Sequence, residues 1–428
     1  MKPAALSFEA LRDAVERLPD DRLASSRRAA LAHLAEHGLP TTRNEDWKYT
    51  DLAPVIDISN RWLQRERETA PSHEREKMVE QVCRSIDADW LVICDGAIDN
   101  RFATDFEQPG ISVTRLSEHG GELQFGMPLS DLNAALLQDG LRIHIAGGAT
   151  PSRPVGILLI DHAATSPGMS QARIEIELEA NSAASFVEYH VSSGAADHYA
   201  NTVTTLRLGD NSRADCVRIQ NRAGNHSQTG RLSVVSGRDS RFRHCAFDLG
   251  GKFIRNDLHV DIARPGAQVE FNGLYLAGDQ QHIDNHTRAD HRVGPATSTQ
   301  EYRGIVAGSA RGVWNGKAIV YEGADGTDAS QTNHNLLLSD KAEVDAKPEL
   351  EIYADDVKCS HGTTVGELDE TALFYLRTRG LSEHEAKQVL TRAFAQAIVS
   401  KSPIASMHDT LADRIADRLA NLLQGAGA

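Results

Sequence analysis

Apolar residues near the start of the chain recur with the spacing of α-helices. Leucine and alanine residues repeat in this way over residues 20–38, and Gly38 followed by Pro40 supplies a stop signal. A second helix is predicted over residues 73–86, and the Arg- and Glu-rich residues 61–67 are interpreted as a connection. The pattern therefore predicts a helical N-terminal region over residues 1–88.

From residue 89 the pattern changes to that of β-strands. The sequence "WLVICDG" predicts a buried strand that ends in a glycine turn. In "RIEIELE", Ile174, Ile176 and Leu178 alternate with glutamates, which is the two-residue period of a half-buried strand. The same alternation returns over residues 258–263 and 268–276. This part of the chain is therefore predicted to be mainly β.

The turns between these strands recur at a regular distance. Small or polar turns begin at Ala180, Gly209, Gly237 and Pro265, a period of about 28 residues, which is typical of a solenoid. Since the repeats have the pattern of strands, we predict a parallel β-helix over residues 89–366. The repeat is degenerate and is interrupted over residues 278–326, so a two-sheet sandwich with long hairpins remains the alternative.

The chain becomes helical again after Gly366. A short helix is predicted to end at Gly380, and Ser382 with Glu385 forms a capping box for the next one. That helix carries an apolar stripe from Ala386 to Ile398, and a final helix carries another. Residues 367–428 are therefore predicted to form a C-terminal helical region that packs on the β-helix, on itself or on a partner.

Composition and charge exclude several functional classes. The chain has 428 residues, of which 40% are hydrophobic and 25% charged, as in ordinary globular proteins. A net charge of -15 argues against binding to nucleic acid, and no apolar run approaches the ~18 residues of a membrane helix. The N-terminus does not resemble a signal peptide. We therefore expect a cytoplasmic protein that binds neither nucleic acid nor a membrane.

The segment "DVKCSHGTT" carries the first candidate site. On a strand, residues two positions apart point to the same face, so Cys359 and His361 are expected to lie side by side. A thiol and an imidazole both bind iron, zinc and copper. The alternative is a small buried cysteine next to a surface histidine, and these two residues alone do not decide between the two interpretations.

A second cluster of potential ligands lies in "QQHIDNHTRADHR". His282, Asp284, His286 and Asp290 share one face if this segment is a strand, so His282, His286 and Asp290 are a weaker candidate metal site. The favoured interpretation is structural: these side chains form polar ladders or turn hydrogen bonds on the β-helix, or line a dimer contact.

Two further features are interpreted as structural. Cys216 and Cys245 are almost one repeat apart and are expected to form a ladder of buried free thiols, with a sulfur relay as the alternative. The five cysteines contain no CxxC pair. The polar segment "TTRNEDWKYT" carries Trp47 and Tyr49 and is expected to pack as an amphipathic lid on the helical domain.

Motifs for common catalytic functions are absent from the sequence. In "WNGKAI", Ala318 replaces the Ser or Thr that a phosphate-binding loop requires after Lys317. A carbohydrate-active β-helix enzyme would need carboxylate pairs and aromatic platforms, but only 5% of the residues are aromatic and they form no row. We therefore expect a protein without catalytic activity of its own.

Three segments together resemble a known family. They are "RNEDWKYT", "NHTRADHRVGPATSTQEYRGIV" and "YADDVKCSHGTTVGELDETALFYLRTRGLSEHEAKQVL", and the similarity extends from about residue 41 to 400. They resemble the SufB/SufD family of iron–sulfur cluster assembly proteins, and "KCSHGTTVGELDE" is similar to the SufD branch of it. The resemblance implies a right-handed parallel β-helix between helical end regions.

The resemblance also implies a function and partners. It implies a non-catalytic scaffold that pairs with SufB and carries SufC, an ABC-type ATPase, on its C-terminal helices, and that forms a homodimer in isolation. His361 would be a ligand for iron or a transient iron–sulfur cluster at the SufB interface, with Cys359 as its neighbour. The resemblance leaves open whether a flavin binds to the complex. A purely structural adaptor without metal contact is the main alternative.

Overall fold

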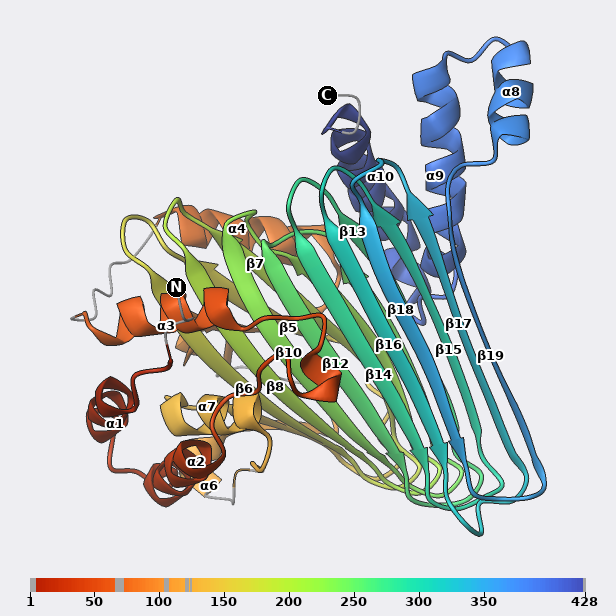
Figure 1. Cartoon of the computed structure of the whole chain (residues 1–428). Helices are drawn as coiled ribbons and strands as arrows, with labels where there is room; N and C mark the ends of the chain where they lie inside the picture. Colours follow the sequence, from red (N-terminus) through yellow and green to blue (C-terminus); the bar gives the residue numbers. More distant parts are fainter. Residues whose placement is uncertain (1–4, 66–72, 104–107, 120–122, 124, 426–428) are drawn as a thin grey trace.

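The computed structural model describes residues 5–425, except for residues 66–72, 104–107, 120–122 and 124. Its centre is a parallel β-helix in which the chain passes alternately through two facing sheets (Figure 1). Helices lie at both ends of the chain, as the sequence predicts. None of the described helices is both long enough and apolar enough to span a lipid bilayer.

The helices fall into three groups along the sequence. Those of the N-terminal region are α1 (Phe8–Glu16), α2 (Ala24–His37), η1 (Glu45–Trp47), α3 (Ala53–Leu63) and α4 (His73–Ser85). Three short helices accompany the first coils, namely α5 (Asn100–Ala103), α6 (Leu116–His119) and α7 (Pro128–Leu136). The C-terminal group is α8 (Glu370–Thr378), α9 (Glu383–Val399), η2 (Ala405–Met407) and α10 (His408–Gly425).

The strands form two sheets, which we call sheet A and sheet B. In spatial order from the C-terminal end, sheet A contains β19 (Val357–Gly366), β17 (Thr327–Leu337), β15 (Thr297–Val306), β13 (Gln268–Ala277), β11 (Arg241–Asp248), β9 (Arg213–Asn221), β7 (Ala183–Ser193), β5 (Val155–His162), β1 (Asp89–Cys94) and β2 (Ala97–Ile98). Sheet B contains β18 (Glu343–Ile352), β16 (Arg311–Val320), β14 (His282–His291), β12 (Phe253–Ile262), β10 (His226–Ser236), β8 (His198–Leu208), β6 (Gly168–Leu178), β4 (Leu141–Ile145) and β3 (Ile111–Arg115).

The register of the strands confirms the repeat seen in the sequence. Thr229 of β10 pairs with Asn201 of β8 and with Arg255 of β12, and successive coils in both sheets keep a similar offset. The turn residues Asn181, Asn211 and Asp239 all have positive φ, which asparagine and aspartate tolerate better than most residues. The expected interruption over residues 278–326 is wrong, because β14, β15 and β16 continue the ladder through it.

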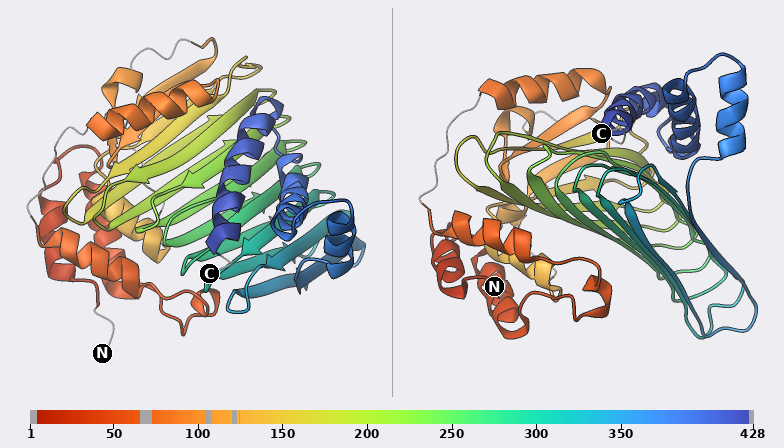
Figure 2. Two further views of the ribbon diagram at one scale, coloured as in Figure 1. Left: turned by 90° about the horizontal axis from the view of Figure 1, so that it is seen from above. Right: turned by 45° about the horizontal axis from the view of Figure 1, so that its top comes forward.

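The two largest hydrophobic cores pack against opposite faces of sheet A. The inner core lies between the sheets and contains residues from Leu91 to Trp314. The second core lies on the outer face of sheet A, where α4, α9 and α10 pack against it (Figure 2). Strand β5 of sheet A packs against both cores, and its sequence VGILLIDH is therefore a nearly continuous hydrophobic run. The C-terminal helices therefore complete the fold.

The capping box at the start of α9 forms as predicted, with Ser382 and Glu385 bonded reciprocally. The apolar stripe predicted on α9 is only partly buried. Ala386 and Ile398 are buried, but Val389 is 45% exposed. The first half of this helix extends beyond the sheet and packs against α8 instead (Figure 1).

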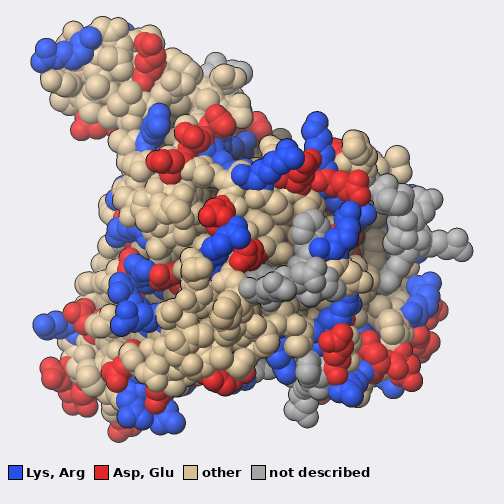
Figure 3. All heavy atoms as spheres, turned by 180° about the vertical axis from the view of Figure 1, so that it is seen from behind, with Lys and Arg blue, Asp and Glu red and all other residues tan. Residues whose placement is uncertain are grey.

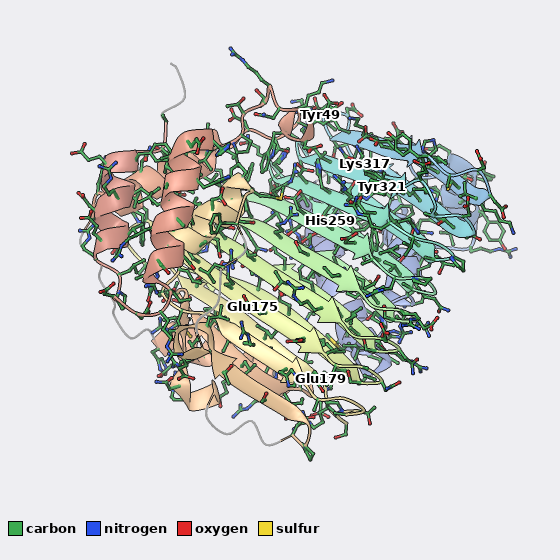
Figure 4. All side chains as sticks on the ribbon, turned by 90° about the horizontal axis from the view of Figure 1, so that it is seen from below. Tyr49, Glu175, Glu179, His259, Lys317 and Tyr321 are labelled. Carbon is green, nitrogen blue, oxygen red and sulfur yellow. The ribbon has the colours of Figure 1, made fainter. Side chains whose placement is uncertain are left out.

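The segment around Trp47 and Tyr49 is only partly where it was expected. Trp47 packs against the hydrophobic core of the N-terminal helices, but the segment also crosses the outer face of sheet B, with Tyr49 near Lys317 (Figure 4). The guanidinium of Arg255 lies 4.3 Å from the centre of the Trp47 ring, and Thr50 donates a 2.5 Å hydrogen bond to Asp284. We call residues 45–50 the strap.

Truncation of a buried side chain on α10 will test the second core. Leu411 is fully buried between α10 and sheet A, so Leu411→Ala is expected to lower the free energy of unfolding by about 2–5 kcal/mol. The exposed Val389→Ala on α9 should change it by less than about 0.5 kcal/mol. Urea unfolding followed by circular dichroism measures both, and equal midpoints would contradict this packing.

Buried histidines make the stability dependent on pH. Burial lowers the pKa of His244 inside the β-helix to about 3, with a contribution from Arg218. A histidine with a lowered pKa stabilises the fold above pH 6.5, and this stabilisation is lost as the pH falls toward the folded pKa. As the pH falls from 6.5 to 5, protonation of His244 is expected to lower the free energy of unfolding of the wild type by about 2 kcal/mol. His244→Gln should lack this part of the decrease. An unchanged pH slope in urea unfolding would contradict the prediction.

Candidate functional site

The last coil of the β-helix forms an open end. Strand β18 pairs with β16 and strand β19 pairs with β17, and no further described strand pairs with either of them. Most residues of β19 are exposed, whereas the preceding strand of sheet A is largely buried. The first coils differ, because the antiparallel strands β2 and β3 flank them. The open end therefore presents two unpaired strand edges.

Cys359 and His361 lie on the last strand of sheet A and share one face, as predicted. They pair with Ala329 and Gln331 of β17, which are buried inside the β-helix. The register therefore places the thiol and the imidazole on the inward-facing row, at the mouth of the interior. His361 is exposed and Cys359 is half-buried only because no further coil covers them.

The two side chains of this pair are of the kinds that bind iron. Burial raises the pKa of the Cys359 thiol, and Asp328 raises it further, so the neutral thiol predominates until a metal or a cation displaces its proton. A thiolate and an imidazole are both good ligands for iron, but two ligands do not fill a four-coordinate site. The missing ligands have room to approach from the open end.

A helical arm projects beside the open end. It consists of α8 and the first half of α9 and extends away from the β-helix (Figure 1). Phe374 is 69% exposed and Tyr375 is 55% exposed on α8, and both have the size of residues that anchor interfaces. The face shown in Figure 3 carries intermixed acidic and basic side chains. The arm therefore presents exposed aromatic side chains, and it follows the end of β19 that is farther from Cys359 and His361.

The second predicted cluster is on the outer face of sheet B and is satisfied by neighbouring side chains. His282 lies 2.9 Å from the Thr50 hydroxyl of the strap, and His286 lies 3.1 Å from Asp284. The pKa of Asp284 is lowered because the guanidinium of Arg255, 2.5 Å away, and His286 outweigh the effect of burial.

Asp290 is separated from these histidines by its own partners. It accepts hydrogen bonds from Arg288 and Arg292 and lies 3.2 Å from the His259 ring. Burial opposes ionisation, but His259 and Arg288 lower the pKa of Asp290 to about 2. Within the described parts of the chain, His282, His286 and Asp290 do not converge on a metal-sized site. The structural interpretation of this cluster agrees with these contacts.

The two central cysteines do not form a ladder. Cys216 pairs with His244, one position before Cys245, so the two thiols point to opposite faces of sheet A. Cys216 faces the inner core, and Cys245 contacts the Ile398 carbonyl of α9 at 3.9 Å. The expectation of a thiol ladder is therefore wrong, because a shift of one residue in register reverses the face.

One cluster was missed by sequence reasoning. Asp95 lies directly after β1, Asp161 lies on β5 and His198 begins β8. Their ligand atoms nevertheless lie within 4.8 Å of one another. The three residues are far apart in the sequence, and their spacing matches no metal-binding motif. A search for polar residues at the inward positions of neighbouring coils would have found them.

Comparison with known proteins identifies the family of this chain. A family model described as "SUF system FeS cluster assembly, SufBD core domain" matches residues 160–394, and another described as "SufBD protein N-terminal region" matches residues 5–96. The core match includes β19 with Cys359 and His361, and also α8 and most of α9.

Similar proteins cover nearly the whole chain. The chain is 29% identical to the iron–sulfur cluster assembly protein SufD of Escherichia coli (strain K12), over 91% of both chains. It is also 29% identical to a SufBD family iron–sulfur cluster assembly protein of Synechocystis sp., over 92% of this chain and 90% of that one. The SufD protein of Bacillus subtilis (strain 168) is 27% identical over 64% of this chain and 63% of its own. The chain therefore belongs to the SufBD family of the SUF system, and its role is in iron–sulfur cluster assembly.

Proposed function

We propose that this chain is a non-catalytic scaffold subunit on which an iron–sulfur cluster is assembled at a subunit interface. In this proposal its open end pairs with SufB, its helical arm binds the SufC ATPase, and His361 and Cys359 contact the iron or the growing cluster. The observation that carries the proposal is the position of this pair at the mouth of the open β-helix.

The unpaired edges at the open end support the pairing. An exposed strand edge offers a row of backbone N–H and C=O groups to another chain, and proteins usually protect such edges. Here β18 and β19 end the ladder, and Val365 on the last strand is 48% exposed. A related chain that ends in the same way can continue both sheets. A second copy of this chain can do the same, which accounts for the expected homodimer in isolation.

The geometry of the ligand pair supports a shared site. Side chains that face inward at the last coil of this chain would meet those at the last coil of a partner if the two β-helices join end to end. The partner would then supply the ligands that Cys359 and His361 lack. The cluster is cargo in this scheme, because an incomplete ligand set binds it only while both subunits are present.

The arm supports the attachment of the ATPase. Its exposed Phe374 and Tyr375 form an apolar surface that the β-helix does not cover. The second half of α9 is fixed to sheet A through Ile398 and Val399. A partner bound to the arm would therefore be mechanically connected to the sheet whose last strand carries His361.

Substitution of the imidazole tests the chemical role. In complexes with SufB and SufC, His361→Ala is expected to lower iron and sulfide content about tenfold, because a ligand is lost at an already incomplete site. Cys359→Ser should reduce it as well. Iron and sulfide analysis and the visible absorbance of the purified complex measure this effect.

The matched control is Ser360→Ala, which lies between the two residues and points to the opposite face of β19. It should leave both the complex and its cluster content unchanged. Normal cluster content in the Cys359 and His361 variants, with the complex intact, would leave this chain as a structural adaptor without metal contact.

Substitution on the arm tests the binding of the ATPase separately. Phe374→Asp should weaken binding of SufC by at least about 30-fold, because a charge replaces a large apolar contact. Phe374→Leu keeps the apolar character and should retain most of the affinity. Titration calorimetry measures both. Equal affinity of the wild-type and Asp variants would remove the arm from the interface.

A further inference from the structure

A cavity of about 650 Å³ lies at the opposite end of the β-helix from Cys359 and His361. It is bounded by the ends of α3 and α4, the turn between β1 and β2, and the loop that follows β5. Its lining includes Asp95 and His198, and Asp161 is adjacent to both. These three residues are the cluster that sequence reasoning missed.

The fold brings the three side chains together at one corner of the coils. Asp95 follows β1 and Asp161 lies near the end of β5, so both continue the inward-facing rows of sheet A. His198 begins β8 and faces inward from sheet B. The corner at which sheet A strands end and sheet B strands begin therefore collects two carboxylates and one imidazole. This combination of ligands suits first-row divalent metal ions.

His198 is buried and has no hydrogen-bond partner among the described residues. Its side chain is 2% exposed, and Nδ1 contacts no acceptor or donor. Its Nε2 lies 3.7 Å from Asp161 Oδ1, which is too long for a hydrogen bond. It is close to the ~3.4 Å that separates two ligands of one tetrahedral ion at about 2.1 Å from each. The nitrogen that is available to an ion is therefore Nε2, which makes no hydrogen bond to a described residue and lies between Asp161 and the cavity.

The two carboxylates are held by hydrogen bonds from neighbouring groups. Residues that ligate metal ions are usually held in the same way. Arg222 donates a 2.5 Å hydrogen bond to Asp161 Oδ2, which leaves Oδ1 directed toward His198. The backbone N–H of His162 donates to Asp95 Oδ1 at 2.8 Å, and Arg75 lies 2.5 Å from Oδ2. Such outer contacts fix the position of ligands without occupying all their lone pairs. The cavity beside them has room for water molecules to complete the coordination.

We propose that Asp95, Asp161 and His198 bind one divalent first-row transition-metal ion, with water as the remaining ligand on the cavity side. The site is independent of the cluster contact proposed at His361, because the two lie at opposite ends of the β-helix. It would be a resident ion site within this subunit alone, and it requires no partner chain.

Metal binding to the isolated full-length chain tests the proposal. The background protein carries Cys359→Ser and His361→Ala, so that the open-end ligands do not contribute. After treatment with a chelator, titration with Co²⁺ or Zn²⁺ alone should show one ion bound per chain. Co²⁺ should give a visible absorption band, and the ion should raise the temperature of unfolding.

Variants of the three ligands identify the site. In the same background, His198→Leu and Asp95→Asn should each weaken binding at least about tenfold and abolish the Co²⁺ band. Thr165→Ala is the control, since Thr165 lines the same cavity but is neither one of the three ligands nor one of the outer contacts described above. It should change the affinity less than about twofold.

Two outcomes would overturn the proposal. One is the absence of a bound ion in the background protein at one equivalent. The other is unchanged affinity in both His198→Leu and Asp95→Asn. Circular dichroism establishes that the variants are folded, and Asp95→Asn provides a second measurement at a less buried position if His198→Leu does not fold. Loss of cluster content in the His361→Ala complex would have no bearing on either outcome.

Discussion

The backbone ladder between successive coils is the constraint on which the rest of this structure depends. Each strand satisfies its N–H and C=O groups through the strands before and after it, in parallel register. This arrangement pairs the backbone groups of each coil with those of its neighbours but exposes two edges at its last coil. The first coils are flanked by the antiparallel strands β2 and β3. The fold thus determines which end can receive another chain.

The second constraint is the apolar outer face of sheet A. A sheet that is hydrophobic on both faces must be covered, and α4, α9 and α10 cover it. Sheet B needs less cover, because its outward side chains are polar and paired, as Glu175 is with Arg142 (Figure 4). The helices that complete the core also carry the arm. Stability and the proposed attachment of a partner therefore involve the same segment of chain.

Polar clusters on this β-helix have to be judged by what surrounds them. The residues around Asp284 have the composition of a metal site, but Thr50 of the strap and Arg255 both bind its Oδ2, and His286 lies 3.1 Å from its Oδ1. The group around His198 has fewer residues, yet its imidazole has no hydrogen-bond partner among the described residues. Judged by composition alone, the cluster around Asp284 is the better candidate for a metal site. The second cluster is nevertheless the better candidate, because His198 Nε2 lies beside Asp161 without a hydrogen bond, whereas His282 and His286 already lie against Thr50 and Asp284.

The sequence by itself determined the local features of this protein. The repeat of about 28 residues, the capping box at Ser382 and the common face of Cys359 and His361 were all predictable, because residue spacing sets the face within one strand or helix. The resemblance of whole segments supplied the family. Neither the residue spacing nor the resemblance of segments depends on which coils are neighbours in the folded protein.

Only the tertiary structure decided the long-range features. The opposite faces of Cys216 and Cys245 depend on register between coils, and the position of the strap depends on docking against Arg255. The meeting of Asp95, Asp161 and His198 depends on both sheets closing at one corner. Such contacts join residues far apart in the chain, and the spacing within any one segment carries no information about them. The exposure of His361 likewise follows from the absence of a further described strand beyond β19.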